Sequence, residues 1–408
     1  MIDYPLTTIV EGITKILVPD LDAYKALSPS FPPSEAPVFY NPRMEINRDF
    51  ALAMLRTFVQ LEKQEKQLSY CEPMAGTAVR TVRVANEIEN INVIINDINP
   101  SAIKLIKKNI QQLNLKKKTR VFFRDANELL IHHAVTGEQF DVIDLDPFGS
   151  PARFMDATAQ AIAKGGLLAI TSTDMATKCG VYPQACIRKY CAQPIHSWIG
   201  HEVALRILLG FVIATLARHQ KRGKPVFAHS TAHFIRVYLT VAKGNTKAKQ
   251  AMKNLGYIAH CPQCGSLEST REIVNSLTRV CPYCEQKRLL GGPLWLGQLY
   301  DKQYVDKLGK ELNEGIGVYG TKKRMTKILS LISDEVKAFS KDEKTICYYD
   351  LHKLSDKLNL PVPKTLDVIE TLQKQDYVAS RTHFKLTAIK TNAPIDKINT
   401  VIGRLISD

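Results

Sequence analysis

An apolar run that ends in an acidic residue and a proline stands out in this sequence. Residues 140–145 read Phe-Asp-Val-Ile-Asp-Leu, and Asp146, Pro147, Phe148 and Gly149 follow directly. A buried strand here would place the Asp146 carboxylate and the Pro147 carbonyl at the carboxyl edge of a parallel sheet, where α/β enzymes bind ligands. Both oxygens could accept from an exocyclic amine, favouring the pyramidal nitrogen that attacks a methyl donor, while Phe148 stacks on the base. The alternative is an ordinary turn after a strand.

A turn of small residues lies upstream. Residues 68–78 predict a short strand that runs into this turn around Gly76, and residues 79–86 predict a helix after it. Small residues let the backbone approach a ligand closely, and the helix N-terminus favours a negative group such as a carboxylate. The turn lacks the three glycines of a dinucleotide fingerprint, because Met74 and Ala78 occupy the flanking positions.

Acidic residues also end two further predicted strands. Asp97 closes residues 93–97 and lies 21 residues after Gly76, the spacing at which a carboxylate can receive ribose hydroxyls. Asp125 follows a strand near residue 122 and could accept from an adenine amino group, while Ala126 donates its backbone N–H. With helical crossovers between them, these strand ends predict a doubly wound, Rossmann-like α/β sheet that holds an adenosine-type cofactor. Taken singly, each acid is more often a helix cap or a turn residue.

With these elements the chain resembles the archaeal-type tRNA (guanine-26-N2)-dimethyltransferase family, which uses S-adenosylmethionine. The matching elements follow one another in family order through most of residues 1–245. They are Val10–Gly12, Val38–Pro42, Asn47–Asp49, Ala75–Gly76 with Arg80, Asn96–Asp97, Asp125–Asn127, Asp146–Pro151, Thr173–Met175 and Glu202–Arg206. The F-Y-N-P, N-R-D and D-P-F-G elements together are not shared by generic methyltransferases.

The resemblance implies a class I methyltransferase sheet and a set of residues that bind S-adenosylmethionine. Arg48 and Arg80 are the implied cations for the methionine carboxylate, a role that suits the planar fork of arginine. Asp97 is the implied ribose ligand, and Asp125 with Ala126 is the implied adenine contact. At Thr77-Ala78 the chain departs from its relatives, which more often keep a second Gly-type residue.

The resemblance also assigns the guanine site. Asp146 is the implied catalytic acceptor, together with the carbonyl of Pro147. Phe148 and Phe39 are the implied stacking partners of a flipped guanine. For Phe39 the alternative is a core aromatic beneath an extended segment.

Two pairs of cysteines have the spacing of a zinc site. The sequence shows C-x2-C, sixteen intervening residues and a second C-x2-C, and the residues are Cys261, Cys264, Cys281 and Cys284. This spacing is typical of a tetrahedral four-cysteine zinc site built from two knuckles. Disulfides are the alternative, but a cytosolic chain keeps its thiols reduced. A closed site of this kind leaves no open coordination position, so its zinc would stabilise the fold.

The overall charge agrees with a nucleic-acid substrate. The chain carries 55 Lys and Arg against 40 Asp and Glu, a formal net charge of +15, and a basic protein attracts phosphates by Coulomb forces and counterion release. Residues 1–245 hold 29 basic and 22 acidic residues, and residues 246–408 hold 26 and 18. Both halves are therefore candidate surfaces for tRNA. The run Lys116–Lys118 is most simply a solvated turn, with a phosphate contact as the alternative.

A domain boundary is expected near residue 245, where the strand-like residues 232–241 give way to a glycine and a polar run. Residues 1–245 would form the methyltransferase domain with an amino-terminal extension. Residues 246–408 would form a smaller α+β domain that binds tRNA, with a zinc-ribbon-like part at residues 257–288.

Residues 340–400 predict a winged-helix-like end. Apolar residues at helical spacing indicate two helices, around residues 351–358 and 366–372, and residues 377–379 and 383–386 predict a short hairpin after them. Basic side chains here could face phosphates, although such folds often serve only as packing modules. These side chains are Lys364, Lys374, Arg381 and Lys385.

The length of 408 residues exceeds what a single hydrophobic core usually serves. No apolar run is expected to span a membrane, because residues 203–216, the longest candidate, are interrupted by Arg206 and fit a buried helix. The amino terminus lacks the basic-then-apolar pattern of a signal peptide. We therefore expect a cytoplasmic protein, with no membrane contact and no evident obligate protein partner.

Three functions remain open at this point. The first is a tRNA methyltransferase that takes up a guanine displaced from its stack. The second is a DNA or other-RNA amino-methyltransferase, whose D/N-P-P-Y-type motif shares the chemistry but differs at Phe148 and Gly149. The third is a zinc-ribbon and winged-helix regulator without catalysis. The acids Asp97, Asp125 and Asp146 favour an enzyme.

Overall fold

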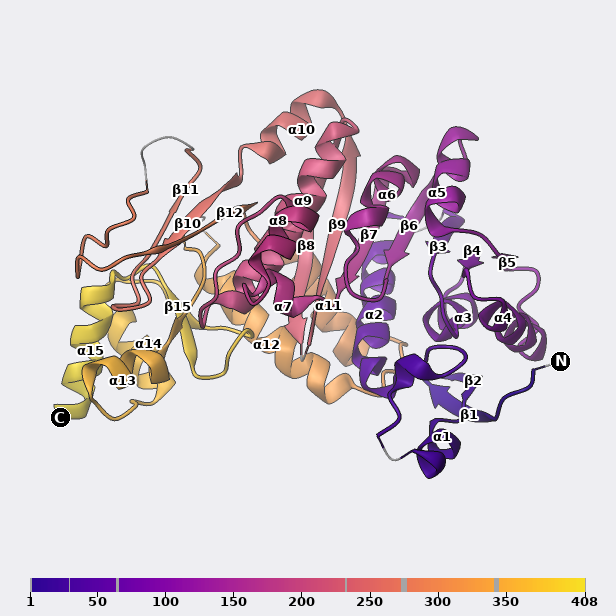
Figure 1. Cartoon of the computed structure of the whole chain (residues 1–408), viewed down its shortest axis with the longest axis horizontal. Coiled ribbons are helices and arrows are strands. Elements are labelled where there is room, and N and C mark those ends of the chain that lie inside the picture. Colours follow the sequence, from indigo (N-terminus) through magenta and orange to yellow (C-terminus); the bar gives the residue numbers. More distant parts are fainter. Residues whose placement is uncertain are drawn as a thin grey trace. The chain divides into compact units, whose positions relative to one another are not determined.

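The computed structural model describes residues 2–28, 30–63, 66–231, 233–272, 277–340 and 345–407, and Figure 1 shows the whole chain. The chain packs as two compact units. The first comprises Met1–Thr171, Tyr238–Lys243 and Asp306–Lys327, and the second comprises Ser172–Val237, Gly244–Val305 and Ile328–Asp408. The assignment of cofactor binding to residues 1–245 and of tRNA binding to residues 246–408 stays a prediction.

A seven-stranded sheet forms the framework, with the strand order β5-β4-β3-β6-β7-β9-β8. Its strands are β3 (Leu68–Glu72), β4 (Ile91–Asn96), β5 (Thr119–Phe122), β6 (Phe140–Leu145), β7 (Ile162–Ser172), β8 (Lys221–Thr231) and β9 (Phe234–Lys243). The five strands from β3 to β7 pair in parallel. Their order reverses beside β3, which is the doubly wound arrangement. The predicted α/β class is therefore confirmed. Ala232, the first residue of the predicted strand 232–241, lies outside the described residues.

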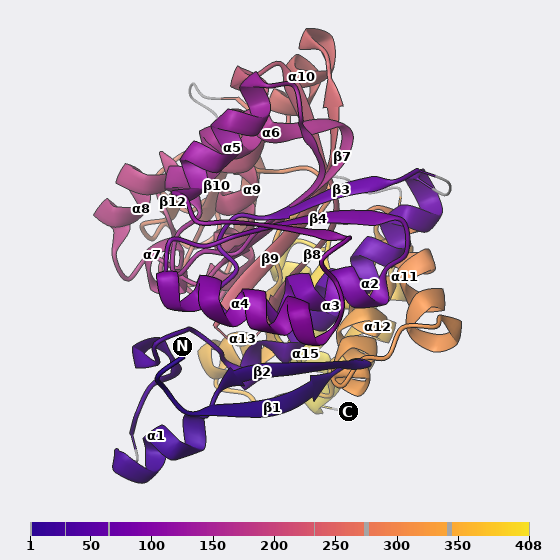
Figure 2. The same ribbon diagram turned by 90° about the vertical axis from the view of Figure 1, so that its right-hand side faces the viewer.

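Helices connect the parallel strands and cover the sheet. They are α2 (Glu45–Glu62), α3 (Val79–Glu87), α4 (Pro100–Gln112), α5 (Ala126–Val135) and α6 (Met155–Ala161). Figure 2 shows α2, α3 and α4 on one face of the sheet and α5 and α6 on the other. All six residues of β6 are buried, as expected for a strand covered on both faces. The parallel strands end at one edge, so the residues that follow them share that edge.

Local sequence signals explain where these helices begin. Asn99 caps α4 by accepting from the backbone N–H of Ser101 at 2.9 Å, and Pro100 occupies the first helical position. Both features are typical of helix starts. Along α4, the apolar residues at helical spacing are buried, and Lys104 and Lys107 face solvent.

Smaller elements complete the first unit. They are β1 (Leu6–Glu11), β2 (Thr14–Pro19), α1 (Leu21–Leu27) and the 3-10 helices η1 (Pro33–Glu35), η2 (Pro42–Met44) and η3 (Ala152–Phe154). Strands β1 and β2 form an antiparallel hairpin, and Gly12 in its turn has φ +59°. A Cβ atom there would lie 2.6 Å from Glu87 Oε1 and 2.7 Å from Arg83 Nη2. Both the backbone conformation and the lack of space therefore require glycine.

A buried charge network joins this hairpin to α2 and α3. Arg83 is fully buried, and it donates to Asp49 Oδ1 at 2.8 Å, to Glu87 Oε1 at 3.1 Å and to Glu11 Oε2 at 3.4 Å. Arg48 donates to both oxygens of Glu11, at 2.5 and 2.7 Å. Burial would raise the pKa of Glu11, but Arg48 and Arg83 outweigh it and lower the pKa. Each buried charge in this network thus has an opposite partner.

The second unit is built around a long buried helix. Its first elements are α7 (Met175–Lys178), α8 (Pro183–Tyr190), α9 (Gly200–Arg218), α10 (Asn245–Met252), β10 (Leu255–His260), β11 (Leu267–Thr270) and β12 (Leu289–Trp295). Helices α11 (Lys302–Glu314) and α12 (Lys322–Ala338) contribute residues to both units. Among the described residues, α9 alone has the length and apolar composition of a membrane span, and 78% of that stretch is buried inside the protein.

The carboxy-terminal elements follow a helix–helix–hairpin order. They are β13 (Tyr349–Asp350), α13 (Leu351–Leu358), α14 (Thr365–Gln373), β14 (Ala379–Arg381), β15 (Ala388–Thr391) and α15 (Ile395–Ser407). The three strands form an antiparallel sheet in the order β13-β15-β14. The two helices lie where the sequence predicts them. Residues 341–344 of the predicted winged-helix-like segment lie outside the described residues.

The predicted hairpin was wrong in its second strand, and its first strand, β14, begins at Ala379, two residues later than the predicted residues 377–379. Residues 383–386 do not pair as a strand, and β15 begins five residues later than predicted. Ala388 and Ile389 are fully buried, whereas Leu386 is 60% exposed. His383 turns inward, and its Nε2 accepts from the backbone N–H of Ser230 at 3.2 Å. Residues 388–391 form the strand because their side chains are buried. Their sequence has no alternation of apolar and polar residues that would have predicted this register.

A second buried charge network lies in this unit. Glu202 on α9 accepts from Arg206 Nε at 2.8 Å and from Lys390 Nζ at 3.0 Å. Lys390 also donates to Glu335 at 3.2 Å, and Glu335 accepts from Thr382 at 2.7 Å. The network joins α9, α12 and β15, and Glu202 itself is fully buried.

Replacement of Arg83 by alanine is expected to destabilise the protein. Asp49, Glu87 and Glu11 would lose their shared cation in a site away from water, and breaking a buried ion pair typically costs about 3–5 kcal/mol. Urea unfolding should measure the loss. Lys15→Ala, on the exposed face of β2, serves as the control and should leave the midpoint close to that of the wild type. An Arg83→Ala midpoint equal to that of the control would contradict the role of the network.

Candidate active site and candidate metal centre

Arg80 lies among carboxylates at the ends of β3 and β6. It is the second residue of α3, and its side chain is 4% exposed. Its Nη1 donates to Glu72 Oε1 at 2.7 Å and to Asp144 Oδ1 at 3.1 Å. Its Nη2 donates to Asn47 Oδ1 at 2.8 Å and also to Asp146. One guanidinium therefore contacts α2, β3, the end of β6 and the residue that follows it.

The charges of this group do not balance. Burial alone would lower the pKa of Arg80, but Asp144, Asp146 and Glu72 outweigh it and raise the pKa well above its ordinary value. The guanidinium is therefore always charged, and three carboxylates face one cation. Glu72 and Asp144 are almost fully buried, whereas the side chain of Asp146 is 18% exposed. Of these carboxylates, Asp146 is the one placed to contact a ligand.

The backbone after β6 presents acceptors at the same edge. Pro147 has no backbone N–H, so Asp146 and Pro147 offer oxygens without a competing donor between them. Gly149 adopts φ +73°, which turns the chain sharply into η3. Arg80 fixes the direction of the Asp146 carboxylate by a charge-assisted hydrogen bond. The arrangement can hold the N–H groups of an amine and stabilise positive charge that develops on its nitrogen.

Two aromatic rings lie together beside this edge. Phe148 is 68% exposed, an unusual position for a phenylalanine. Its ring meets that of Phe39 edge-on, with centroids 4.5 Å apart and an interplanar angle of 76°. Phe39 precedes η2, and its backbone carbonyl would lie 3.3 Å from a Cβ on Gly76. The structure thus brings both predicted stacking residues to the Gly76 turn and the Asp146 segment.

Asp97 is tied to the Gly76 turn. Its Oδ2 accepts from the backbone N–H of Gly76 at 2.7 Å, and its Oδ1 accepts from Asn99 at 2.8 Å. The backbone N–H of Ala75 also donates to the carbonyl of Asn96. These bonds place the carboxylate at the end of β4 beside the turn after β3. Asp97 is half-buried there, so it can still face a ligand.

Asp125 caps α5. Its side chain accepts from the backbone N–H groups of Asn127 and Glu128, at 2.8 and 3.3 Å. Asp125 is exposed, and Ala126 beneath it is buried. The cap accounts for an acid at this position without any ligand. The adenine role of Asp125 and Ala126 therefore stays a prediction.

Arg48 and Arg80 form ion pairs with different carboxylates. Arg48 is engaged by Glu11 and by the backbone carbonyl of Asn41, at 3.3 Å, within the Arg83 network. Arg80 is engaged by the carboxylates of the strand edge. Both guanidinium groups already have acceptors, so either would have to exchange or share a partner to bind a methionine carboxylate. That role also stays a prediction for both.

Sequence reasoning missed three residues of this site. Glu72, Asp144 and Asn47 surround Arg80, and none was proposed as a site residue. A signal was available for two of them, since Glu72 ends its strand and Asp144 alternates with Asp146 along β6. Asn47 had no such signal, because its contact with Arg80 depends on how α2 packs.

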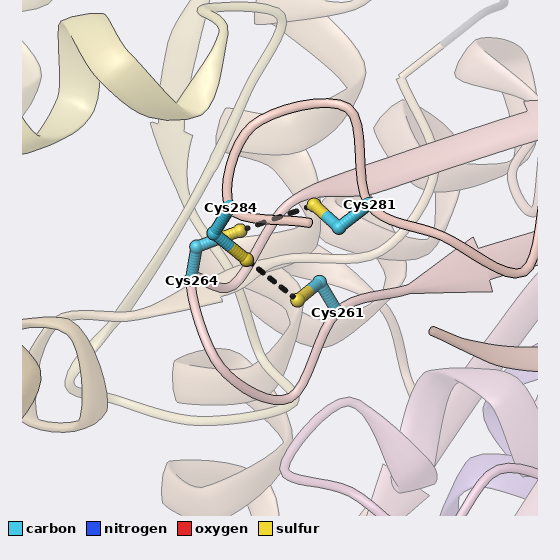
Figure 3. Close-up of side chains that lie close together, drawn as sticks. All are labelled: Cys261, Cys264, Cys281 and Cys284. Carbon is cyan, nitrogen blue, oxygen red and sulfur yellow. Dashed lines mark hydrogen bonds between the residues drawn. The ribbon is translucent and has the colours of Figure 1, made fainter. Parts of the chain in front are cut away.

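The four predicted zinc ligands lie together in the second unit. Figure 3 shows their side chains pointing toward one another from two loops, and their sulfur atoms all lie within 4.8 Å of one another. Cys261 Sγ and Cys284 Sγ are 3.5 Å apart, as are Cys264 Sγ and Cys281 Sγ. A disulfide would need about 2.05 Å, and all four cysteines are free thiols.

The two loops share one backbone geometry. In the first, the N–H of Gly265 donates to the carbonyl of Cys261, and in the second, the N–H of Glu285 donates to the carbonyl of Cys281, both at 2.9 Å. Gly265 and Glu285 both have positive φ, at +86° and +59°. Tetrahedral zinc with bonds of about 2.3 Å sets sulfur atoms about 3.8 Å apart. The donor set and its spacing therefore fit a structural zinc ion, and Lys357, which donates to the carbonyl of Gln263 at 2.6 Å, supplies nearby positive charge.

The purified protein is expected to contain about one zinc ion per chain. Cys261→Ser should lower the zinc content and the thermal stability of the second unit, because metal binding and folding are coupled at such sites. Elemental analysis and thermal unfolding measure the two effects. Cys191→Ser, at an exposed cysteine outside the cluster, is the matched control and should retain full zinc content. Retention of zinc by both variants would rule out this site.

Comparison with known proteins gives one consistent result. Residues 12–403 match the family described as N2,N2-dimethylguanosine tRNA methyltransferase. The chain is 38% identical to the tRNA (guanine(26)-N(2))-dimethyltransferase of Methanobrevibacter smithii over 100% of both chains. It is also 38% identical to the enzyme of that name from Methanosphaera stadtmanae, over 97% of this chain and 96% of the relative.

A solved structure agrees with the sequence comparisons. Trm1 from Pyrococcus horikoshii, in complex with S-adenosyl-L-methionine, superposes with a TM-score of 0.81 and 30% identity, over 97% of this chain and 100% of the other. The match covers both compact units. The chain therefore belongs to the N2,N2-dimethylguanosine tRNA methyltransferase family.

Proposed function

We propose that this protein transfers methyl groups from S-adenosylmethionine to the exocyclic N2 of guanine 26 in tRNA, giving N2,N2-dimethylguanosine. The observation that supports this most directly is the Asp146 carboxylate, which is partly exposed at the end of β6 and oriented by Arg80. Phe148 and Phe39 lie beside that edge. Family membership over nearly the full chain supports the choice of substrate. We infer that the protein acts in the cytoplasm, with tRNA as its partner.

The amine must be activated because its lone pair is delocalised into the purine ring. We propose that Asp146 Oδ and the Pro147 carbonyl accept the two N2–H groups, which favours a pyramidal nitrogen with a localised lone pair. When bound, S-adenosylmethionine supplies an electrophilic methyl group on its sulfonium. As the N–CH3 bond formed, the S–CH3 bond would break and the sulfur would leave as the thioether S-adenosylhomocysteine. The Asp146 carboxylate would stabilise the positive charge on the nitrogen and then accept the proton that it loses. Phe148 and Phe39 would stack on the guanine and set its plane.

The charge around Arg80 suits the reaction. Among the described residues, Glu72, Asp144 and Asp146 all form ion pairs with the guanidinium of Arg80, so this group has more carboxylates than guanidinium groups. A negative edge favours the positive charge that passes from the methyl donor to the amine. We propose that Asp97 binds the ribose hydroxyls and that Asp125 with Ala126 contacts the adenine. For the methionine carboxylate we keep Arg80 and Arg48 as the proposed cations.

The reaction can be tested directly. The protein is incubated with labelled S-adenosylmethionine and an unmodified tRNA transcript, and the nucleosides are then analysed. We expect N2,N2-dimethylguanosine, and we expect the label to disappear when guanine 26 is replaced by adenine. Label on double-stranded DNA but not on tRNA would move the assignment to a DNA amino-methyltransferase. Absence of cofactor binding would favour a regulator without catalysis.

Asp146→Ala should lower kcat for methyl transfer on the order of a hundredfold or more. Removal of one preorganised group at a developing charge has effects of this size. Binding of S-adenosylmethionine, measured by calorimetry, should stay close to that of the wild type. Asp156→Ala, an exposed carboxylate on α6, is the control and should keep normal activity. Normal turnover by Asp146→Ala would overturn the assignment of the acceptor.

A further inference from the structure

The positive charge of the chain is concentrated in one stretch. Residues 175–267 contain 13 Lys and Arg and a single acidic residue, Glu202. This stretch therefore carries +12 of the total +15. Glu202 is fully buried and paired with Arg206 and Lys390. Four of the 13 cations are buried as well, namely Lys178, Arg206, Lys221 and Arg236. The other nine are exposed or half-buried, and the stretch has no exposed carboxylate, so its surface attracts polyanions.

This stretch begins at the catalytic edge of the sheet. β6 and β7 are adjacent and parallel, with Leu145 paired to Ile170. β7 therefore ends on the same edge at which β6 ends before Asp146. Helices α7 and α8 follow β7 directly in the chain (Figure 1). We call residues 175–191, which contain both helices, the α7–α8 arm.

A buried cluster anchors the arm. Lys178 on α7 is fully buried, and it donates to Ser172 Oγ at 2.8 Å and to the carboxylate of Asp174. Tyr190 at the end of α8 donates to Asp174 at 2.9 Å. One carboxylate therefore links both helices to the end of β7. Separating Lys178 from Asp174 would leave a buried charge without a partner, which is unfavourable. The pair therefore holds α7 against the end of β7.

The outer face of the arm combines an aromatic ring, an apolar side chain and a cation. Tyr182, just before α8, is 61% exposed, and Ile187 is 39% exposed. Gln184, Ile187 and Arg188 have helical spacing on the exposed side of α8, opposite the buried Cys186. Within the described residues Arg188 forms no ion pair, and the Tyr182 ring stacks on no other ring. An exposed aromatic ring and an unpaired cation on one short segment are the two kinds of group that bind bases and phosphates.

We propose that the α7–α8 arm is a tRNA-contacting surface, on which Tyr182 stacks against a base or ribose and Arg188 pairs with a phosphate. The inference rests on the proposed function for its substrate. The charge of the stretch decides the kind of partner, since a surface without exposed carboxylates complements a polyanion. The arm follows β7 in the chain, and β7 runs parallel to β6, the strand that Asp146 follows. A role of the arm in binding a protein partner is the competing outcome.

The test compares tRNA binding by full-length variants at several salt concentrations. Tyr182→Ala should raise the Kd for tRNA on the order of tenfold, the effect of losing one stacked base. Arg188→Glu should raise the Kd as well and reduce the slope of log affinity against log salt by about one. The KM for tRNA should rise with the Kd, and the affinity for S-adenosylmethionine should match that of the wild type.

Lys164→Glu is the matched control. Lys164 is exposed near the start of β7, whereas the arm follows the end of β7, so Lys164→Glu makes the same change of charge outside the arm. An effect of Arg188→Glu no larger than that of Lys164→Glu would overturn the proposal, since only the overall charge would then matter. So would unchanged tRNA binding by Tyr182→Ala, whether or not the variant alters binding to another protein. Failure of the wild type to methylate a tRNA that it binds would instead refute the proposed function.

Discussion

A buried arginine surrounded by carboxylates determines the geometry of the sheet edge at which Asp146 lies, the proposed catalytic edge. Carboxylates that are brought together away from water repel one another unless a cation lies among them, and Arg80 is that cation for Glu72, Asp144 and Asp146. Its planar fork has fixed directions, so the side chains that share it are fixed relative to one another. Glu72 and Asp144 take one terminal nitrogen, which leaves the other for Asp146 and Asn47. The chemistry proposed at Asp146 therefore depends on Glu72, Asp144 and Asn47, the other residues that bind Arg80.

The family-typical segments divide into two physical roles. Gly12 and the segment Asn47–Asp49 build the buried support, since Arg48 and Asp49 belong to the Arg83 network and Asn47 to the Arg80 group. The segments with Phe39 and Phe148 form the partly exposed surface at the catalytic edge. A segment can thus be typical of the family because it holds α2, α3 and the first hairpin together. This explains why Arg48, which sequence resemblance connects with the cofactor, is found in an ion pair with Glu11.

Local sequence patterns predicted the strands, the turn and the cysteine cluster, but they did not predict side-chain contacts between residues far apart in the chain. The apolar residues of β6 and the small-residue turn before α3 indicated the sheet and its edge, and the cysteine spacing indicated a cluster whose sulfur atoms indeed lie together. Of the partners of Arg80, Asn47 could not be predicted, because it reaches Arg80 only through the packing of a helix that begins 35 residues earlier in the chain. The register of β15 was missed for a similar reason, since burial of Ala388 and Ile389 depends on neighbouring helices. Counting charges separately for residues 1–245 and 246–408 also concealed that most of the net positive charge lies within residues 175–267.

That distribution resolves a conflict between the catalytic edge and its proposed substrate. Carboxylates gathered around Arg80 suit a developing ammonium centre, but they repel phosphates, and tRNA carries a phosphate at every nucleotide. Residues 1–174 hold 19 basic and 21 acidic residues, so this part of the chain has no surplus of cations with which to offset the repulsion. The surplus begins at residue 175, immediately after β7. Under the proposed function, a neutral base would approach this acidic edge while cations elsewhere held its backbone. The separation of charge along the chain would then match the two tasks of base flipping.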